Sequence, residues 1–301
     1  MKPLDSVIVG LSLSEHDAHL LSYAAMLAGL GIGKKFQFVH VVTPQLARPG
    51  SVDHAEVLRQ MQAEVSQPFG HLADRVQCTF DVREGVRLDQ MLAFIEQYPS
   101  DLVLVAHRPL SHGRQSLAKR LAKICPTSVW MVPHQAPCQI ARVLAPIDFS
   151  SHSADALCLA TKVAKLAGAS ECLALHVYYD SSMIRYDETI EEDLHHEEDA
   201  FEKFIEPIDL HDVNVTPIFD EESDITKAIL RIASEQQSDL IVMSTRGRSP
   251  AASVLLGSET SQILMDSPIP VLALKHRGAF LNLFQVLTDH KTWSHAEPKA
   301  N

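Results

Sequence analysis

Short apolar runs without polar alternation recur along the chain, separated by longer segments whose apolar residues repeat at helical spacing. In the second half the apolar runs predict strands at 142–148, 172–178, 213–219, 239–244 and 270–276. The intervening segments predict helices at 153–168, 190–208 and 224–237, with another after Gly257. Strands that are apolar throughout and joined by helices indicate a parallel sheet covered on both faces. We therefore expect a doubly wound α/β fold.

The same pattern occurs twice. Four blocks of the first half recur in the second half in the same order, at offsets of 136, 136, 138 and 142 residues. They are 7–12 with 143–148, 38–42 with 174–178, 101–107 with 239–245, and 126–134 with 268–276. Such an order predicts a duplicated domain, with one doubly wound α/β unit in each copy. We expect tandem domains with parallel five-stranded sheets at 1–135 and 140–276, and a short helix with a polar tail at 277–301.

Composition and charge limit the classes of binding partner that we expect for this protein. The net charge of −12 argues against a general nucleic-acid binder, because a broadly acidic surface repels phosphate backbones. No signal peptide or membrane-spanning run is apparent, so no membrane partner is expected. The five cysteines are odd in number and form no C-x-x-C pair. We therefore expect a reduced, cytoplasmic protein.

The segment 244–264, STRGRSPAASVLLGSETSQIL, carries the candidate chemistry. In open parallel sheets, ligands lie beyond the carboxyl ends of the strands. Gly257 is predicted to begin a helix whose amino end suits a phosphate. A glycine after a strand and a Gly-Ser at a helix start are also common caps, so the spacing leaves both interpretations open. The candidate site residues are Pro146, Ile147, Asp148, Val177, Met243, Ser244, Arg246, Gly247, Arg248, Gly257, Ser258, Glu259 and Thr260.

This segment resembles the signature of the universal stress protein family, G-x-x-G, nine residues, then G-[ST]. It fits at every position except the first, where Ser244 replaces glycine. APIDFS, the LHV of 175–177 and SPIPVLALK also fit. The resemblance implies binding of ATP, ADP or AMP, with or without Mg²⁺. It implies adenosine contacts by Asp148 and by the Val177 backbone, and phosphate contacts by the two motif glycines with Ser258 and Thr260.

The first half departs from this pattern. Ser12 stands where the second half has Asp148, and Gln115-Ser116 align with Gly257-Ser258. The loop between His107 and Pro126 is four residues shorter than its counterpart. We expect a degenerate nucleotide site and a structural role for this half. In the family the last strands of two domains pair across a dimer, so strands 128–134 and 270–276 are expected to pair within one chain, and a homodimer is a further alternative.

Other features favour structural interpretations. GLGIG at 29–33 follows a predicted helix and is more typical of a C-cap than of a dinucleotide loop. HHEED at 195–199 has ligand-like spacing but lies in a strongly acidic segment, so no metal site is expected. His40 and His176 end equivalent strands and are interpreted as packing and hydrogen-bonding residues.

Three functions remain as hypotheses. The first is a tandem universal stress protein with a stress-response or signalling role that binds ATP in its second domain. The second is an interaction and dimerisation module of the same fold without nucleotide. The third, an ATP pyrophosphatase, lacks its S-G-G-x-D-S loop. No catalytic constellation can be assembled from the strand ends, so at most slow ATP hydrolysis is expected.

Overall fold

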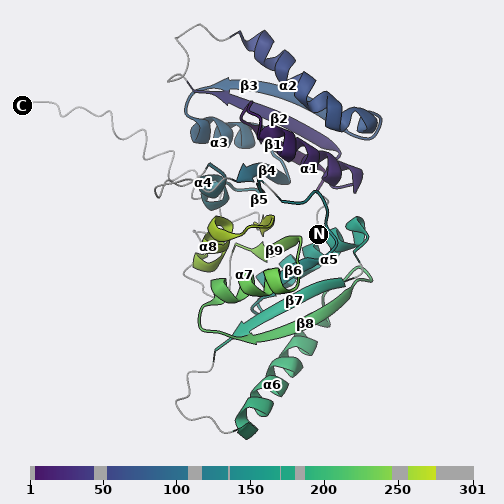
Figure 1. The fold of residues 1–301 in the computed structure, drawn as a ribbon, viewed down its shortest axis with the longest axis vertical. Coiled ribbons are helices and arrows are strands. Elements are labelled where there is room, and N and C mark those ends of the chain that lie inside the picture. Colours follow the sequence, from purple (N-terminus) through teal and green to yellow (C-terminus); the bar gives the residue numbers. More distant parts are fainter. Residues whose placement is uncertain are drawn as a thin grey trace, which may run out of the picture.

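The computed structural model describes residues 4–43, 53–107, 117–134, 136–169, 171–179, 187–245 and 257–275, with backbone alone at 187–194 and 258. Within them, all strands belong to a single ten-stranded sheet of order β3-β2-β1-β4-β5-β10-β9-β6-β7-β8. Figure 1 shows the two halves of the chain following one another along the long axis of the molecule.

Strands and helices alternate in the first half. Its elements are β1 (Ser6–Leu11), α1 (Asp17–Gly29), β2 (Lys35–Val42), α2 (His54–Phe69), a 3-10 turn (Gly70–Leu72), β3 (Gln77–Glu84), α3 (Arg87–Gln97), β4 (Leu102–His107), α4 (Leu117–Ile124) and β5 (Ser128–Pro133).

The second half repeats this order. Its elements are β6 (Val143–Ile147), α5 (Ser151–Ala167), β7 (Glu171–Tyr178), α6 (Asp187–Ile205), β8 (Asn214–Glu221), α7 (Ile225–Glu235), β9 (Leu240–Ser244), α8 (Ser258–Asp266) and β10 (Val271–Leu274). None of the helices in the described part of the chain has both the length and the apolar character needed to cross a bilayer.

Each half has five strands, parallel within the half, in the order third, second, first, fourth, fifth. This confirms the expected α/β class and the repeat. The two five-stranded sheets are continuous, because β5 and β10 pair antiparallel and join them into one ten-stranded sheet. The physical reason is that both strands are apolar and buried, and pairing removes two sheet edges that would otherwise be open. The expected pairing of the last strands within one chain is therefore present.

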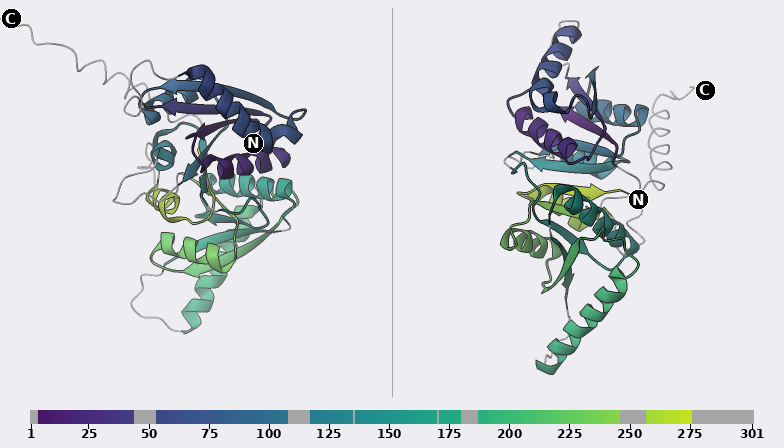
Figure 2. Two further views of the ribbon diagram at one scale, coloured as in Figure 1. Left: turned by 45° about the horizontal axis from the view of Figure 1, so that its top comes forward. Right: turned by 90° about the vertical axis from the view of Figure 1, so that its right-hand side faces the viewer.

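Two apolar cores lie on the two faces of this sheet, and both run through the two halves. One contains residues of α1, α2, α5 and α6; the other contains residues of α3, α4, α7 and α8. Figure 2 shows helices on either side of the strands, while α6 projects beyond β8 at one end of the molecule. Each core crosses the β5–β10 junction, so the two halves pack against one another and share both cores.

Local signals place the helices as the sequence predicts. Ser150 caps α5, where its Oγ accepts from the Ser153 N–H at 3.2 Å, and Gly168 ends that helix with a left-handed φ of 73°. Asp224 caps α7 by accepting from the Lys227 N–H at 2.9 Å. The GLGIG segment is the end of α1 and the turn that follows, which confirms its structural interpretation.

Candidate functional site

The carboxyl ends of β6, β7 and β9 lie at one edge of the second half of the sheet. Ile147 at the end of β6 pairs with His176 of β7, and Val177 follows His176 in the same strand. Met243 and Ser244 end β9, where Ser244 pairs with Leu274 of β10. The sequence-predicted strand-end residues, with Pro146 inside β6, are thus brought to this edge.

Asp148 begins the turn from β6 into α5. Its Oδ1 accepts from the Ser150 N–H at 3.1 Å and from the Ser150 hydroxyl at 2.5 Å. The Asp148 N–H donates to Ser153 Oγ at 3.3 Å. The next residue, Phe149, has a φ of 58°, a left-handed conformation that costs energy for a bulky side chain. The carboxylate therefore stands at the edge of the sheet on a turn that its own hydrogen bonds fix.

The amino end of α8 is tied to the end of β9. The Gly257 N–H donates to the Thr245 carbonyl at 3.0 Å, and the Thr260 hydroxyl donates to the Ser244 carbonyl at 2.9 Å. Thr260 is buried, so this hydroxyl proton serves the fold and is not directed to a ligand in this conformation. Thr260 was expected as a phosphate donor; its observed contact is with the strand end, because that buried carbonyl needs a donor.

Glu259 also has a structural contact. Its Oε2 accepts from the Thr226 hydroxyl of α7 at 2.7 Å. This bond joins α7 to α8 beside the predicted site. Arg246, Gly247 and Arg248 lie outside the described residues, as does the side chain of Ser258. The predicted site is thus described at its strand ends and at the start of α8.

His176 is a neighbour of the site, and the sequence predicts that it packs and forms hydrogen bonds at the end of its strand. Its Nδ1 donates to the Ile147 carbonyl at 3.0 Å, and its Nε2 lies 3.3 Å from Glu197 Oε2 of α6. The Phe149 ring lies against the imidazole, with ring centroids 4.2 Å apart. In the first half, His40 Nδ1 donates to the Leu11 carbonyl at 3.1 Å in the same way. The predicted hydrogen-bonding role of both histidines is confirmed, while the Glu197 contact had no signal in the sequence.

A cavity of about 490 Å³ lies at the equivalent edge of the first half. Its walls come from the ends of β1, β2 and β4, the starts of α1, α3 and α4, and His134 after β5. The lining residues are Gly10, Leu11, Ser12, Ser14, His16, Asp17, Val41, Arg87, Met91, Val105, Ala106, Leu117, Ala118 and His134. By the repeat offsets, eight of these positions correspond to Pro146, Ile147, Asp148, Val177, Met243, Ser244, Glu259 and Thr260 of the second half. In the first half the fold therefore gathers these eight positions around one space.

The described residues contain no group of three or more His, Cys, Asp or Glu side chains that could hold a metal ion. His195 and Glu198 form an exposed pair at 3.2 Å. Burial raises the pKa of every cysteine thiol, which keeps the thiols protonated and weakly nucleophilic. All five cysteines are free.

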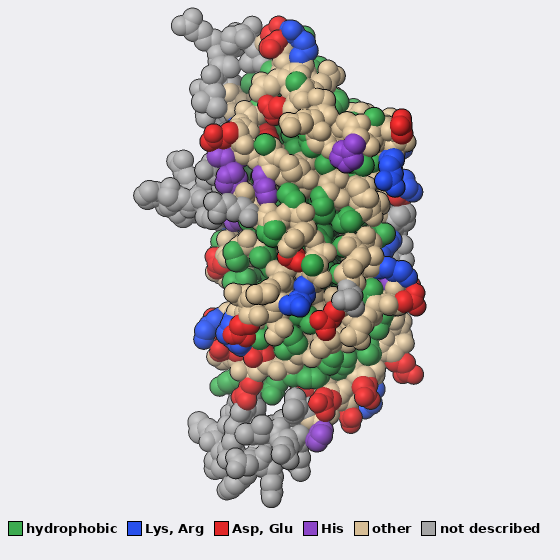
Figure 3. Space-filling view, turned by 45° about the vertical axis from the view of Figure 1, so that its right-hand side comes forward, with side chains coloured by type: hydrophobic (Ala, Val, Ile, Leu, Met, Phe, Trp, Pro, Cys, Tyr) green, Lys and Arg blue, Asp and Glu red, His purple; other side chains and the backbone are tan. Residues whose placement is uncertain are grey.

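The face in Figure 3 carries acidic and basic side chains interspersed, with no broad basic field, and histidine side chains gather over the upper half. Among the described residues, His16 and His134 form an edge contact with ring centroids 4.6 Å apart, and His19 lies 6.4 Å from His134. Two of these three histidines, His16 and His134, line the first-half cavity.

Comparisons with known proteins agree with the fold. A universal stress protein from Archaeoglobus fulgidus DSM 4304 has a similar structure, with a TM-score of 0.66 at 20% identity, over 91% of this chain and 97% of that one. A protein of unknown function from Pseudomonas aeruginosa PAO1 gives a TM-score of 0.69 at 16% identity, over 95% and 98%. At these identities the likeness concerns the fold.

Sequence relatives match over shorter stretches. A universal stress protein of Thermus aquaticus is 41% identical over 49 residues, and one of Mycolicibacterium smegmatis is 36% identical over 55 residues. These stretches cover 16% and 18% of this chain, and 36% and 42% of the relatives. The model of the universal stress protein family matches the chain twice, over residues 3–133 and 139–275. The chain therefore belongs to the universal stress protein family, with two copies of the family's domain in tandem.

Proposed function

We propose that the second half, residues 140–276, binds ATP or another adenine nucleotide at the carboxyl ends of β6, β7 and β9. The observation that carries the proposal is the position of the glycine motif: it lies at the start of α8, beside the end of β9. Gly257 and Ser258 of the glycine motif begin α8, and the start of α8 is held against the end of β9 by Gly257 and Thr260. A helix start fixed beside strand ends suits a phosphate group.

The residues divide between the two ends of the nucleotide. Asp148 and the Val177 backbone would face the adenosine part, with Pro146, Ile147 and Met243 forming the floor. Arg246, Gly247, Arg248, Gly257 and Ser258 would face the phosphates, with Mg²⁺ where the nucleotide carries it. Thr260 and Glu259 would position α8 through Ser244 and Thr226. The first half, residues 1–135, would act as a structural partner whose nucleotide site is degenerate.

In this account the protein is a cytoplasmic stress-response or signalling protein that senses or retains nucleotide, with at most slow hydrolysis. No general base is assigned beside the phosphates. A second candidate is an interaction and dimerisation module of the same fold. Ser244 favours it, because a buried serine stands at the first glycine of the motif, and a side chain there leaves less room for a ligand to approach the backbone.

Two substitutions at one position test the proposal. A Cβ built on Gly257 would lie 3.5 Å from the Thr245 carbonyl oxygen, an ordinary contact, so Gly257→Ala should fold normally and serve as the control. Gly257→Trp places an indole where the phosphates would lie. We expect ATP binding by calorimetry to persist in Gly257→Ala and to be lost in Gly257→Trp, with circular dichroism unchanged in both. Equal ATP affinity in the two variants would contradict the proposal and favour the interaction module.

A further inference from the structure

We propose that the first-half cavity is a second binding site, specific for a small organic anion with one acidic group on an apolar body. This ligand differs from the nucleotide proposed for the second half. The cavity's volume of about 490 Å³ falls in the range of small-molecule sites. The choice of ligand follows from how its walls differ from the equivalent positions of the other half.

The first difference is an exchange of a carboxylate between two positions. In the second half, Asp148 follows the strand and Ser153 lies in the first turns of the helix. In the first half, the corresponding residues are Ser12 and Asp17. The same backbone bond is kept, because the Ser12 N–H donates to Asp17 Oδ2 at 2.7 Å as the Asp148 N–H donates to Ser153 Oγ.

The exchange moves the carboxylate to Asp17, a lining residue whose oxygens are occupied by hydrogen bonds within the turn. Asp17 is only 2% exposed, and its two oxygens accept from the Ser12 N–H, the Ser12 hydroxyl and the Leu13 N–H at 2.7–2.8 Å. Its negative charge is therefore stabilised by three donors of the turn. A ribose hydroxyl would find a serine at position 12, and an anion would not meet an exposed carboxylate there.

The second difference is a cation. Arg87 begins α3 and lies in the cavity wall, whereas its counterpart at the start of α7 is Ile225. No carboxylate within the described ranges forms an ion pair with Arg87. It also stands at the positive end of the α3 dipole, where an anion is favoured. A guanidinium at a helix start recognises a carboxylate or a phosphate with paired hydrogen bonds.

The third difference is the loss of polar groups along the β4–α4 wall. Ala106, Leu117 and Ala118 stand where the second half has Ser244, Glu259 and Thr260. Together with Val41, Met91 and Val105 they form an apolar surface. Each of these three additional side chains is at most 4% exposed. An apolar body fits this surface, while these six side chains offer a polyphosphate no hydrogen-bond donor in return for its lost hydration.

The test uses the full chain and anilinonaphthalene sulfonate, a fluorescent probe with one acidic group on an apolar body. Octanoate and octyl phosphate compete as anionic ligands, and octanol competes as the neutral control. We expect either anion to displace the probe at least about tenfold more strongly than octanol, the equivalent of about 1.4 kcal/mol. The stronger of the two anions identifies the acidic group. Displacement by octanol equal to that by both anions would overturn the proposal.

Three variants locate the site. Arg87→Met should weaken octanoate and octyl phosphate binding about tenfold or more, whereas Arg75→Met, at an exposed arginine outside the cavity, should leave it unchanged. Ala106→Phe should fill the cavity and abolish probe binding. Unchanged binding in both Arg87→Met and Ala106→Phe would overturn the proposal. Gly257→Trp separates the two sites: it should retain the probe, and a first-half cavity that still bound ATP in this variant would contradict the assigned ligand.

Discussion

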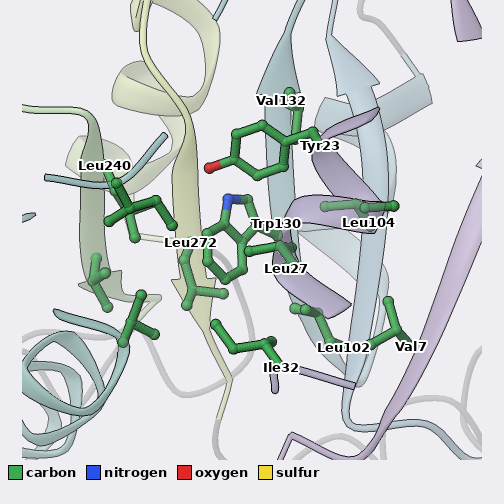
Figure 4. Close-up of a cluster of buried hydrophobic side chains, with 14 of the residues drawn as sticks. Val7, Tyr23, Leu27, Ile32, Leu102, Leu104, Trp130, Val132, Leu240 and Leu272 are labelled. Carbon is green, nitrogen blue, oxygen red and sulfur yellow. The ribbon is translucent and has the colours of Figure 1, made fainter. Parts of the chain in front are cut away.

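Trp130 and Leu272 occupy equivalent positions in the two repeats and face one another directly across the antiparallel pair β5–β10. Both are fully buried. Figure 4 shows Trp130 between Leu272 and Leu27, with Tyr23 against its ring. In a dimer of identical domains this position would meet its own copy. Here a large side chain meets a small one, which makes the junction specific for the first half against the second.

This asymmetry predicts the effect of substitutions at the junction. Trp130→Ala should lower the free energy of unfolding by about 3–5 kcal/mol, the usual cost of truncating a buried tryptophan. The exchanged double variant Trp130→Leu with Leu272→Trp conserves volume, yet it should remain less stable than the wild type. Tyr23 packs on Trp130 with ring centroids 6.0 Å apart, and its counterpart in the second half is Leu159. Urea denaturation measures both; an exchanged variant as stable as the wild type would contradict this packing account.

Lys275 also connects the two halves, through hydrogen bonds from its side chain to the first half. It is buried at the end of β10, and its ammonium donates to the Cys125 carbonyl at 2.6 Å and the Lys123 carbonyl at 3.4 Å, at the carboxyl end of α4. Lys275→Met should cost about 1–3 kcal/mol, because it leaves buried acceptors without a donor. Lys227→Met is the matched control, since Lys227 is exposed and forms an ion pair with Glu222. Thermal unfolding that ranks the two variants equally would argue against a role for this bond in joining the halves.

Two glycines of the GLGIG segment should respond oppositely to alanine. Gly33 has a φ of 90°, and an added Cβ would lie 2.6 Å from the Phe36 ring and 2.9 Å from Val7. Gly33→Ala should therefore destabilise the protein by at least about 2 kcal/mol. Gly29 ends α1 with nothing within 4 Å of an added Cβ, so Gly29→Ala should be neutral or stabilising by up to about 1 kcal/mol. Denaturant midpoints test both, and a tolerant Gly33 would refute the structural interpretation of this segment.

Acid should destabilise the fold through buried histidines. Burial lowers the pKa of His40, and a nearby Arg87 lowers it further. Burial likewise lowers the pKa of His107 and of His19. The unfolded chain then binds more protons than the folded chain as the pH falls through the ordinary histidine range, so stability decreases on acidification and is retained at neutral pH.

The measurement is the free energy of unfolding in urea between pH 7 and pH 5, which spans the ordinary histidine range. We expect a decline toward pH 5 in the wild type and a shallower decline in His40→Gln, because one proton-binding group has been removed. His195→Gln, at an exposed histidine of α6, serves as the control and should keep the wild-type slope. A slope unaffected by His40→Gln would assign the acid sensitivity to other groups.

Much of the fold could be predicted because the apolar runs and helix caps act locally. The strands of the second half, the cap at Asp224 and the turn at Gly168 follow from nearest neighbours in the sequence. The family resemblance, together with the repeat, also predicted the pairing of the two last strands. What local patterns could not supply was the continuity of both cores across that pairing, since it depends on contacts far apart in the chain.

The site was predictable only in part. The sequence predicts Asp148 and Gly257 as site positions, and the fold brings their strand and helix ends to one edge of the sheet. The contacts of Thr260 and Glu259 could not be foreseen, because each partner lies in another element. The exchange between Ser12 and Asp17 was equally hidden: alignment showed the missing carboxylate at Ser12, but only the turn geometry shows Asp17 taking over the backbone bond.

The most direct test of the central proposal is native mass spectrometry of the full chain with saturating ATP and Mg²⁺, alongside Gly257→Trp and Gly257→Ala. We expect one adenine nucleotide per chain in the wild type and in Gly257→Ala, and none in Gly257→Trp. A wild-type chain that binds no nucleotide, or a Gly257→Trp chain that still binds one, would contradict a nucleotide site at the carboxyl ends of β6, β7 and β9.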